Sequence, residues 1–196
     1  MSVKKLTFVD KKSLNAIALG GAVLGSGGGG DPYVGRLMTQ QSIEKSGGVQ
    51  VIDIESLPDD ALILPIAMMG APTVMVEKFP SGDEFAQLIP MIEKMLTKPV
   101  SAILCAEAGG LNSTIPFVAA SKLGLPIIDG DAMGRAFPEL QMVTFTLGGI
   151  SATPMAMVDE KGNGCTFDTI STVSYTHLRA HETDSYRVCR LLLEKK

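Results

Sequence analysis

The sequence has no tryptophan, and aromatic residues make up only 5% of its 196 residues. The formal net charge of -4 provides no basic surface for nucleic acid, and few aromatic side chains are present to stack on bases. No apolar run reaches the ~18 residues of a membrane-spanning helix, and no signal peptide opens the chain. We therefore expect a cytoplasmic protein with neither nucleic-acid nor membrane partners.

Histidine is absent from most of the chain, because both histidines, His177 and His181, lie in the segment 173–196. This segment is similar to one reading frame of a sequencing adapter, so we expect it to be a non-native tail and exclude it from fold and site reasoning. The exclusion matters because two histidines four residues apart, with Cys189 beyond them, imitate a metal site. The rest of the chain offers no histidine base or histidine metal ligand.

Cysteine and arginine are also scarce outside the tail. Cys105 and Cys165 are too few to indicate a disulfide framework. Cys105 ends an apolar run and has no histidine to activate it, so we interpret it as a small core residue. Arg36 and Arg135 each follow a glycine, a placement that favours specific contacts with ligands or carboxylates over a role in solubility.

Glycine, by contrast, is concentrated in residues 25–32, between two segments that both have helical patterns. The spacing of Gly25 and Gly30 is that of a phosphate-binding loop, but Asp31 and Pro32 replace the lysine and hydroxyl, so no nucleotide is expected. Asp31 and Pro32 instead predict the start of a helix. We expect a tight backbone platform for a neutral ligand or another chain segment, with a flexible linker as the alternative.

The order of helical and strand patterns predicts an α/β fold with a mixed or mostly parallel sheet flanked by helices. We assign residues 1–140 to this domain and residues 141–172 to the start of a more β-rich region that is incomplete, before the tail. The predicted helices run from Asp10 to the glycine loop, over 31–47, over 81–96 and from 113 to 123. The predicted strands are 49–54, 62–69, 100–105, 125–128, 141–147 and 154–158, with a hairpin turn at 162–164.

Three carboxylates follow predicted parallel strands, where ligands bind in open α/β sheets. Glu107 comes just after the strand 100–105, and Asp129 and Asp131 come after the strand 125–128. Because the chain lacks histidine outside the tail, we expect a carboxylate to act as the base, alone or through a metal-bound water. The alternatives are that the two aspartates cap backbone amides in a turn and that Glu107 pairs with Lys78 or Arg135.

Four stretches together resemble the S-methyl thiohydantoin desulfurase-like family, long known only as a domain of unknown function. They are residues 25–32, 77–78, 107–113 and 129–139, and the resemblance covers roughly residues 8–172. It implies an N-terminal domain of a longer protein. Relatives often accompany hydantoinase or oxoprolinase-type enzymes, so such a protein is a candidate partner.

The resemblance implies hydrolysis of an S-methylated thiohydantoin or related ring, with release of methanethiol. It makes Asp129, Asp131 and Glu107 the candidate catalytic residues, and Asp129 and Asp131 the ligands of a divalent metal if one is used. The candidate groups that bind the heterocyclic substrate are Gly27, Gly28, Gly29, Gly30, Asn112 and Arg135. The alternative is a non-catalytic small-ligand-binding or accessory subunit, and a homo-oligomer stays open.

Overall fold

A six-stranded mixed sheet forms the centre of the computed structural model, which describes residues 5–70, 80–169 and 188–190. The strand order is β1-β2-β5-β4-β3-β8. The four inner strands pair in parallel, and the two outer strands pair antiparallel to their neighbours. The strands are β1 (Phe8–Val9), β2 (Val49–Ile52), β3 (Leu62–Met69), β4 (Val100–Cys105), β5 (Ile127–Asp131) and β8 (Val188–Arg190).

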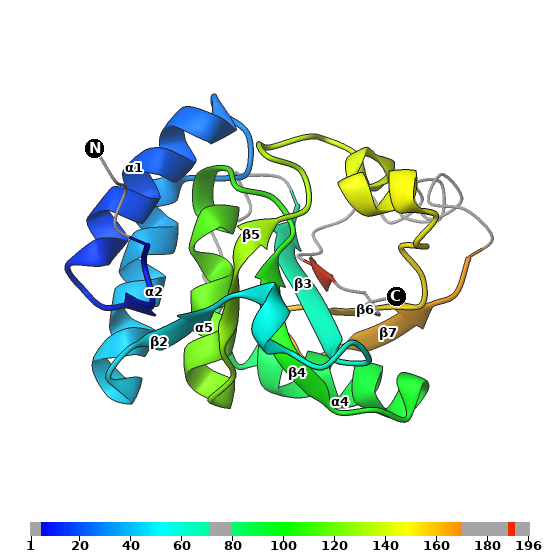
Figure 1. Cartoon of the computed structure of the whole chain (residues 1–196). Coiled ribbons are helices and arrows are strands. Elements are labelled where there is room, and N and C mark those ends of the chain that lie inside the picture. The colour runs from blue at the N-terminus through cyan, green and yellow to red at the C-terminus, as the bar shows by residue number, and fades with distance from the viewer. Residues whose placement is uncertain (1–4, 71–79, 170–187, 191–196) are drawn as a thin grey trace.

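Four α-helices and a small antiparallel hairpin surround this sheet (Figure 1). The helices are α1 (Ser13–Gly25), α2 (Pro32–Ser46), α4 (Glu84–Leu96) and α5 (Ile115–Leu123). The hairpin consists of β6 (Met155–Val158) and β7 (Gly164–Phe167), and four short 3₁₀ helices complete the described elements: η1 (Ile54–Ser56), η2 (Gly110–Ser113), η3 (Leu140–Met142) and η4 (Thr144–Gly148). The expected α/β fold is confirmed.

The core lies mainly between the sheet and the helices. Leu64 and Ile66 of β3 are fully buried in the large cluster that also contains residues of all four helices. Alternate positions, such as Ile63, face the opposite side, where a smaller cluster includes Leu57 and Phe145. Parallel strands covered on both faces need apolar residues at consecutive positions, which explains the uninterrupted apolar sequence of β3.

At the starts of α2 and α4, side chains accept hydrogen bonds from backbone amides. The Asp31 carboxylate accepts a hydrogen bond from the Tyr33 amide at 2.8 Å, and Pro32 occupies the first turn of α2. Before α4, the Ser81 amide donates to Glu84 Oε1 at 3.1 Å, which is one half of a capping box. These local bonds satisfy amides that have no partner within the helix.

One predicted strand is wrong, and so is the predicted end of another. Residues 141–147 form parts of η3 and η4 rather than a strand, and Phe145 of this segment packs onto a face of the sheet. Phe145 is half-buried there, so the segment covers a face of the sheet instead of extending its edge. Asp129 and Asp131 belong to β5 itself rather than to a turn after it, because β5 continues pairing with β4 as far as Asp131 opposite Cys105.

Part of the segment expected to be a non-native tail pairs with the sheet. Strand β8 lies antiparallel to β3, with Val188 opposite Met69. The predicted non-native origin of this segment stays a prediction. His177 and His181, which imitate a metal site in the sequence, lie outside the described residues. None of the described helices has the length and apolar character needed to cross a membrane.

Candidate functional site

A cavity of about 330 Å³ lies between α1 and the carboxyl ends of β4 and β5. Apolar side chains from several elements make most of its wall, among them Ile17, Val51, Phe117 and Ile127. Ligands of open α/β sheets bind at this end of the strands. The cavity therefore occupies the place where the sequence predicts a site.

Asp129 and Asp131 both line this cavity. Successive side chains of a strand point to opposite faces, so these two residues share one face of β5 with Ile127. Asp129 is exposed, and its charge contributes to raising the pKa of Lys5, although the hydrogen bond from Lys5 to Asp53 is the larger cause. The structure thus brings two of the three predicted catalytic carboxylates together at one wall.

Asp131 also has the loop-capping contacts that the alternative interpretation predicts. Its Oδ2 atom accepts hydrogen bonds from the Ala108 amide at 2.9 Å and the Gly134 amide at 2.7 Å. These bonds tie the segments after β4 and β5 to each other. Asp131 is therefore a positioned carboxylate, whereas Asp129 is the more accessible of the two.

Glu107, the third predicted carboxylate, is 9% exposed and does not line the cavity. Its Oε1 accepts from Asn112 Nδ2 at 2.5 Å, and its Oε2 accepts from the Phe137 amide at 3.3 Å. Burial raises the pKa of Glu107 above its ordinary value, against the opposing effect of these two hydrogen bonds. Glu107 joins the loop after β4 to the segment after β5; the predicted partner Lys78 lies outside the described residues.

Asn112 is buried at 3% exposure and connects Glu107 to β3. Its Nδ2 donates to Glu107 and also to the Met68 carbonyl oxygen at 2.9 Å, while its Oδ1 accepts from the Met68 amide at 2.8 Å. Both hydrogens of the side-chain amide are thereby donated to protein oxygens. Asn112 therefore has no free side-chain hydrogen to donate to a ring, which was its predicted role.

The glycine loop is packed tightly against the η2 segment. A Cβ on Gly29 would lie 2.1 Å from the Gly109 carbonyl oxygen, and one on Gly110 would lie 2.2 Å from the Gly30 oxygen. The Asn112 amide donates to the Gly29 oxygen at 3.1 Å, which fixes the contact. Of the predicted alternatives, the platform for another chain segment is confirmed and the flexible linker is wrong.

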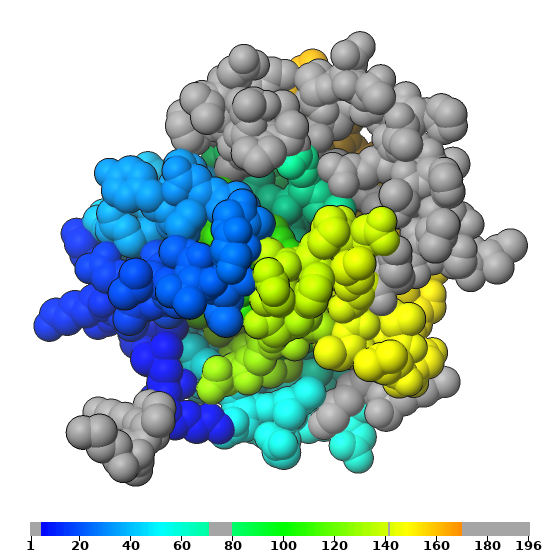
Figure 2. All heavy atoms as spheres, turned by 90° about the horizontal axis from the view of Figure 1, so that it is seen from above, coloured from blue at the N-terminus to red at the C-terminus, as the bar shows by residue number. Residues whose placement is uncertain are grey.

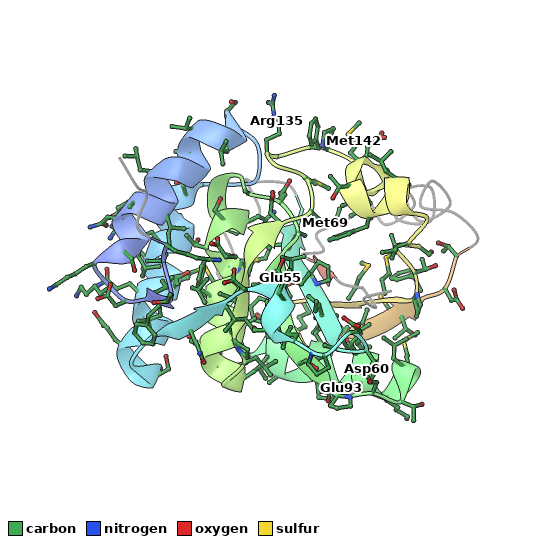
Figure 3. All side chains as sticks on the ribbon, in the orientation of Figure 1. Glu55, Asp60, Met69, Glu93, Arg135 and Met142 are labelled. Atoms are coloured by element: carbon green, nitrogen blue, oxygen red, sulfur yellow. The ribbon has the colours of Figure 1, made fainter. Side chains whose placement is uncertain are left out.

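The remaining predicted binding groups lie away from the cavity wall. Gly27 has open space around it, and Gly28 lies against Ala136, where the segment after β5 reaches the glycine loop (Figure 2). Arg135 is exposed at the end of the molecule near the glycine loop, with its guanidinium 5.4 Å from the centre of the Phe137 ring (Figure 3). The roles of Gly27, Gly28 and Arg135 in binding a ring stay predictions.

The described residues contain no group of three or more His, Cys, Asp or Glu side chains placed to hold a metal ion. The predicted metal ligands Asp129 and Asp131 thus have no third such side chain, and one oxygen of Asp131 already accepts two amides. Cys105 is buried, as predicted, and burial raises the pKa of its thiol far above the usual range.

The sequence analysis missed Ser113, which lines the cavity from the end of η2. Its Oγ is buried and has no hydrogen-bond partner among the described residues. A Cβ on Gly21 would come within 2.4 Å of this oxygen. Two consecutive glycines inside a predicted helix, Gly20 and Gly21, were the signal, because glycine in a helix interior is costly unless another group approaches closely.

Carboxylates at one side of an apolar cavity, at the carboxyl ends of parallel strands, lie where α/β proteins bind small ligands. The chain belongs to the S-Me-THD-like family, since residues 12–169 match the model described as the S-Me-THD-like N-terminal domain. A crystal structure of a protein from Chromobacterium violaceum is similar, with 25% identity and a TM-score of 0.81 over 95% of this chain and 54% of that chain. The chain thus spans about half the length of that relative. No curated protein matches.

Proposed function

We propose that the chain forms the N-terminal part of a hydrolase that acts on S-methylated thiohydantoin or related hydantoin-type rings. Membership of the S-Me-THD-like family supports this reaction class. The observation that carries the proposal is the apolar cavity of about 330 Å³ whose wall includes the carboxylates of Asp129 and Asp131. Apolar walls with a few polar groups suit a small flat heterocycle.

In the proposed reaction, water attacks the ring carbon that bears sulfur. Asp129 takes one proton from the water, and a new carbon–oxygen bond forms as the ring carbon becomes tetrahedral. As the carbon becomes tetrahedral, the π electrons of the ring C=N bond move to the ring nitrogen, which then takes the proton held by Asp129. The new hydroxyl becomes a carbonyl as the carbon–sulfur bond breaks, and the methylthio group leaves with the hydroxyl proton as methanethiol. The carbon that lost sulfur keeps the oxygen, so the ring becomes a hydantoin and no oxidant or reductant is consumed.

Asp129 suits the role of base better than the other two carboxylates. It is exposed at the cavity wall, whereas Asp131 holds the Ala108 and Gly134 amides and Glu107 lies outside the cavity. We assign Asp131 to fixing the loop that borders the site and to adding negative charge beside the attacking water. Glu107 is a positioning residue, because it acts through Asn112 and the Phe137 amide.

The apolar part of the wall determines how the ring is seated. Ile17 and Leu24 of α1 line the cavity together with Phe117 and Ile127. A ring whose substituent is aliphatic or aromatic buries that substituent against these side chains, and burial contributes about 25 cal/mol per Å² of apolar area.

The test is to incubate the chain with a 5-alkyl S-methyl thiohydantoin and to measure methanethiol with a thiol reagent and hydantoin by mass spectrometry. Binding of the same compound is measured in parallel by calorimetry. Stoichiometric formation of both products supports the proposal. Binding without product supports the non-catalytic alternative, in which the domain serves a hydantoinase or oxoprolinase-type partner. If the chain neither binds the compound nor forms product, both proposed functions are contradicted.

A further inference from the structure

Helix α1 exposes apolar side chains to solvent and contains no charged residue. Leu19 and Val23 are each 69% exposed and lie one turn apart. They point away from the sheet, because the buried residues Leu14 and Ala18 mark the opposite side of the helix. A helix at the surface of a globular protein normally carries charged or polar residues on its solvent side. The solvent side of α1 instead has the composition of a surface that another chain covers.

The first turns of α2 extend this apolar surface. The two helices pack side by side (Figure 1), and Tyr33 and Leu37 of α2 are 60% and 42% exposed. The Arg36 guanidinium lies 5.2 Å from the centre of the Tyr33 ring and donates to Asn15 Oδ1 of α1 at 3.3 Å. Tyrosine and arginine are enriched in protein–protein interfaces, and larger exposed apolar patches mark interaction sites. The α1–α2 surface consists of Leu19, Val23, Tyr33 and Leu37.

Charge is nearly absent from this part of the chain. Residues 13–41 contain two charged side chains, Asp31 and Arg36, although 19% of all residues are charged. Neither forms an ion pair with another described residue. The chain as a whole has a net charge of -4, so two copies repel each other elsewhere, whereas one charge of each sign balances here. A surface with balanced charges is compatible with a second copy of itself.

Gly20 lies beside Leu19 and Val23 on the outer side of α1. Glycine in a helix interior is less favourable than alanine. At Gly21 the absence of a side chain has a reason inside the protein, because a Cβ there would strike Ser113. At Gly20 a Cβ would meet no atom of the described residues within 4 Å. The missing side chain of Gly20 thus has no reason in the free chain, and it suits the close approach of another chain's backbone.

The further half of a longer relative is not the nearest occupant of the α1–α2 surface. The family match ends at residue 169, just after β7, and β7 lies on the opposite side of the molecule from α1 (Figure 1). A relative of about twice the matched length, such as the Chromobacterium violaceum protein, therefore continues from the side away from α1. This placement favours a second copy of the chain as the occupant.

We propose that two copies of this chain associate through the α1–α2 surface as a two-fold symmetric dimer. In a two-fold interface the same residues of both copies meet, so Leu19 and Val23 of one copy pack against α1 of the other. The lack of a side chain at Gly20 lets the two helices approach closely. The dimer does not depend on the proposed reaction, because no residue of the α1–α2 surface takes part in it.

Three variants of the whole chain test the proposal by sedimentation equilibrium, which gives the mass and the dissociation constant of a dimer. Val23→Glu and Gly20→Glu each place a charge on the outer side of α1. Leu147→Glu is the matched control, because Leu147 is 91% exposed on η4, outside the α1–α2 surface. Val23 is exposed and Gly20 has open space around it, so urea unfolding at low protein concentration should show that all three variants fold.

We expect the wild type and Leu147→Glu to form dimers with equal dissociation constants. Val23→Glu and Gly20→Glu are expected to raise this constant by about thirtyfold or more, the effect of a residue at the centre of an interface. A wild type that stays monomeric up to its solubility limit overturns the proposal. A dimer that all three variants leave intact, or weaken equally, also overturns it, because the contact then lies elsewhere or responds to added charge alone.

Discussion

The side chain of Asn112 binds both backbone groups of Met68, donating to its carbonyl oxygen at 2.9 Å and accepting from its amide at 2.8 Å. An amide side chain thus takes the place of a neighbouring strand at the carboxyl end of β3. The third bond of Asn112, to Glu107, extends this connection to the segment after β5. Asn112 therefore connects β3 to the loop after β4 and, through Glu107, to the segment after β5.

Asn112→Ala is expected to lower the free energy of unfolding by about 2–4 kcal/mol, because it leaves the Met68 backbone groups and Glu107 without their partner. Urea unfolding followed by circular dichroism measures the change. The matched control is Asn15→Ala, an exposed asparagine on α1 that accepts one bond from Arg36. The control should change stability by less than about 0.5 kcal/mol. Equal effects of the two substitutions would contradict the bridging role.

The raised pKa of Glu107 predicts a specific pH dependence. A carboxyl whose folded pKa is above its ordinary value of 4.5 binds a proton more readily in the folded protein than in the unfolded chain. Its contribution to stability is therefore full below pH 4.5 and is lost as the pH rises through the folded pKa. Glu107→Gln cannot titrate, so the free energy of unfolding of the wild type relative to this variant should fall with rising pH.

The measurement is a set of urea unfolding curves for both proteins from acid to neutral pH. Taking the difference between the two removes the opposite slope from Asp10, Glu44 and Asp83, whose pKa values are lowered by hydrogen bonds and nearby lysines. A difference that rises with pH would mean that the Asn112 and Phe137 bonds outweigh burial of the Glu107 carboxyl.

Substituting two glycines of the same loop distinguishes the effect of backbone strain on stability from the effect of close packing. Both Gly27 and Gly29 have positive φ, at 93° and 77°, but only Gly29 faces a neighbour that a Cβ would strike. Gly27→Ala should cost about 1–2 kcal/mol from strain. Gly29→Ala should cost clearly more, because the obstructing atom is the Gly109 backbone oxygen. Thermal unfolding checks this, and similar losses for both variants would show that the contact with η2 is absent.

The two cysteines outside the segment 173–196 should differ sharply in reactivity. Cys165 is exposed, whereas the Cys105 thiol is buried and its pKa is raised, so few thiolates form at neutral pH. Brief treatment with iodoacetamide, followed by peptide mass spectrometry, should modify Cys165 and leave Cys105 unmodified until urea is added. Rapid modification of Cys105 in the folded protein would contradict its assignment to the core.

The fold was largely predictable because its signals are local. The apolar runs of β3 and β4 and the start of α2 at Asp31 and Pro32 depend only on nearby residues, and their positions agree with the structure. The strand predicted over 141–147 is wrong because this segment packs onto a face of the sheet, with Phe145 half-buried, and such tertiary packing cannot be read from alternation.

The site was only partly predictable. Glu107, Asp129 and Asp131 could be placed at the sheet edge from strand order, but which of them borders a cavity depends on where α1 packs. The contact of the glycine loop with Gly109 and the unused hydroxyl of Ser113 involve residues far apart in the sequence. The consecutive glycines Gly20 and Gly21 indicate that some group approaches α1 closely, but only the three-dimensional structure shows which residue it is.

The most direct test of the proposed hydrolase compares methanethiol release by the wild type, Asp129→Asn and Asp60→Asn. Asp60 is an exposed aspartate with a surface ion pair to Lys98, and it lies before β3 at the other end of the sheet from Met69 (Figure 3). Asp129→Asn should lower the rate by about a hundredfold or more, the range for loss of a general base, with an unchanged unfolding midpoint. Asp60→Asn should keep the wild-type rate. Equal rates for all three proteins would contradict a role for the Asp129 carboxylate in the reaction.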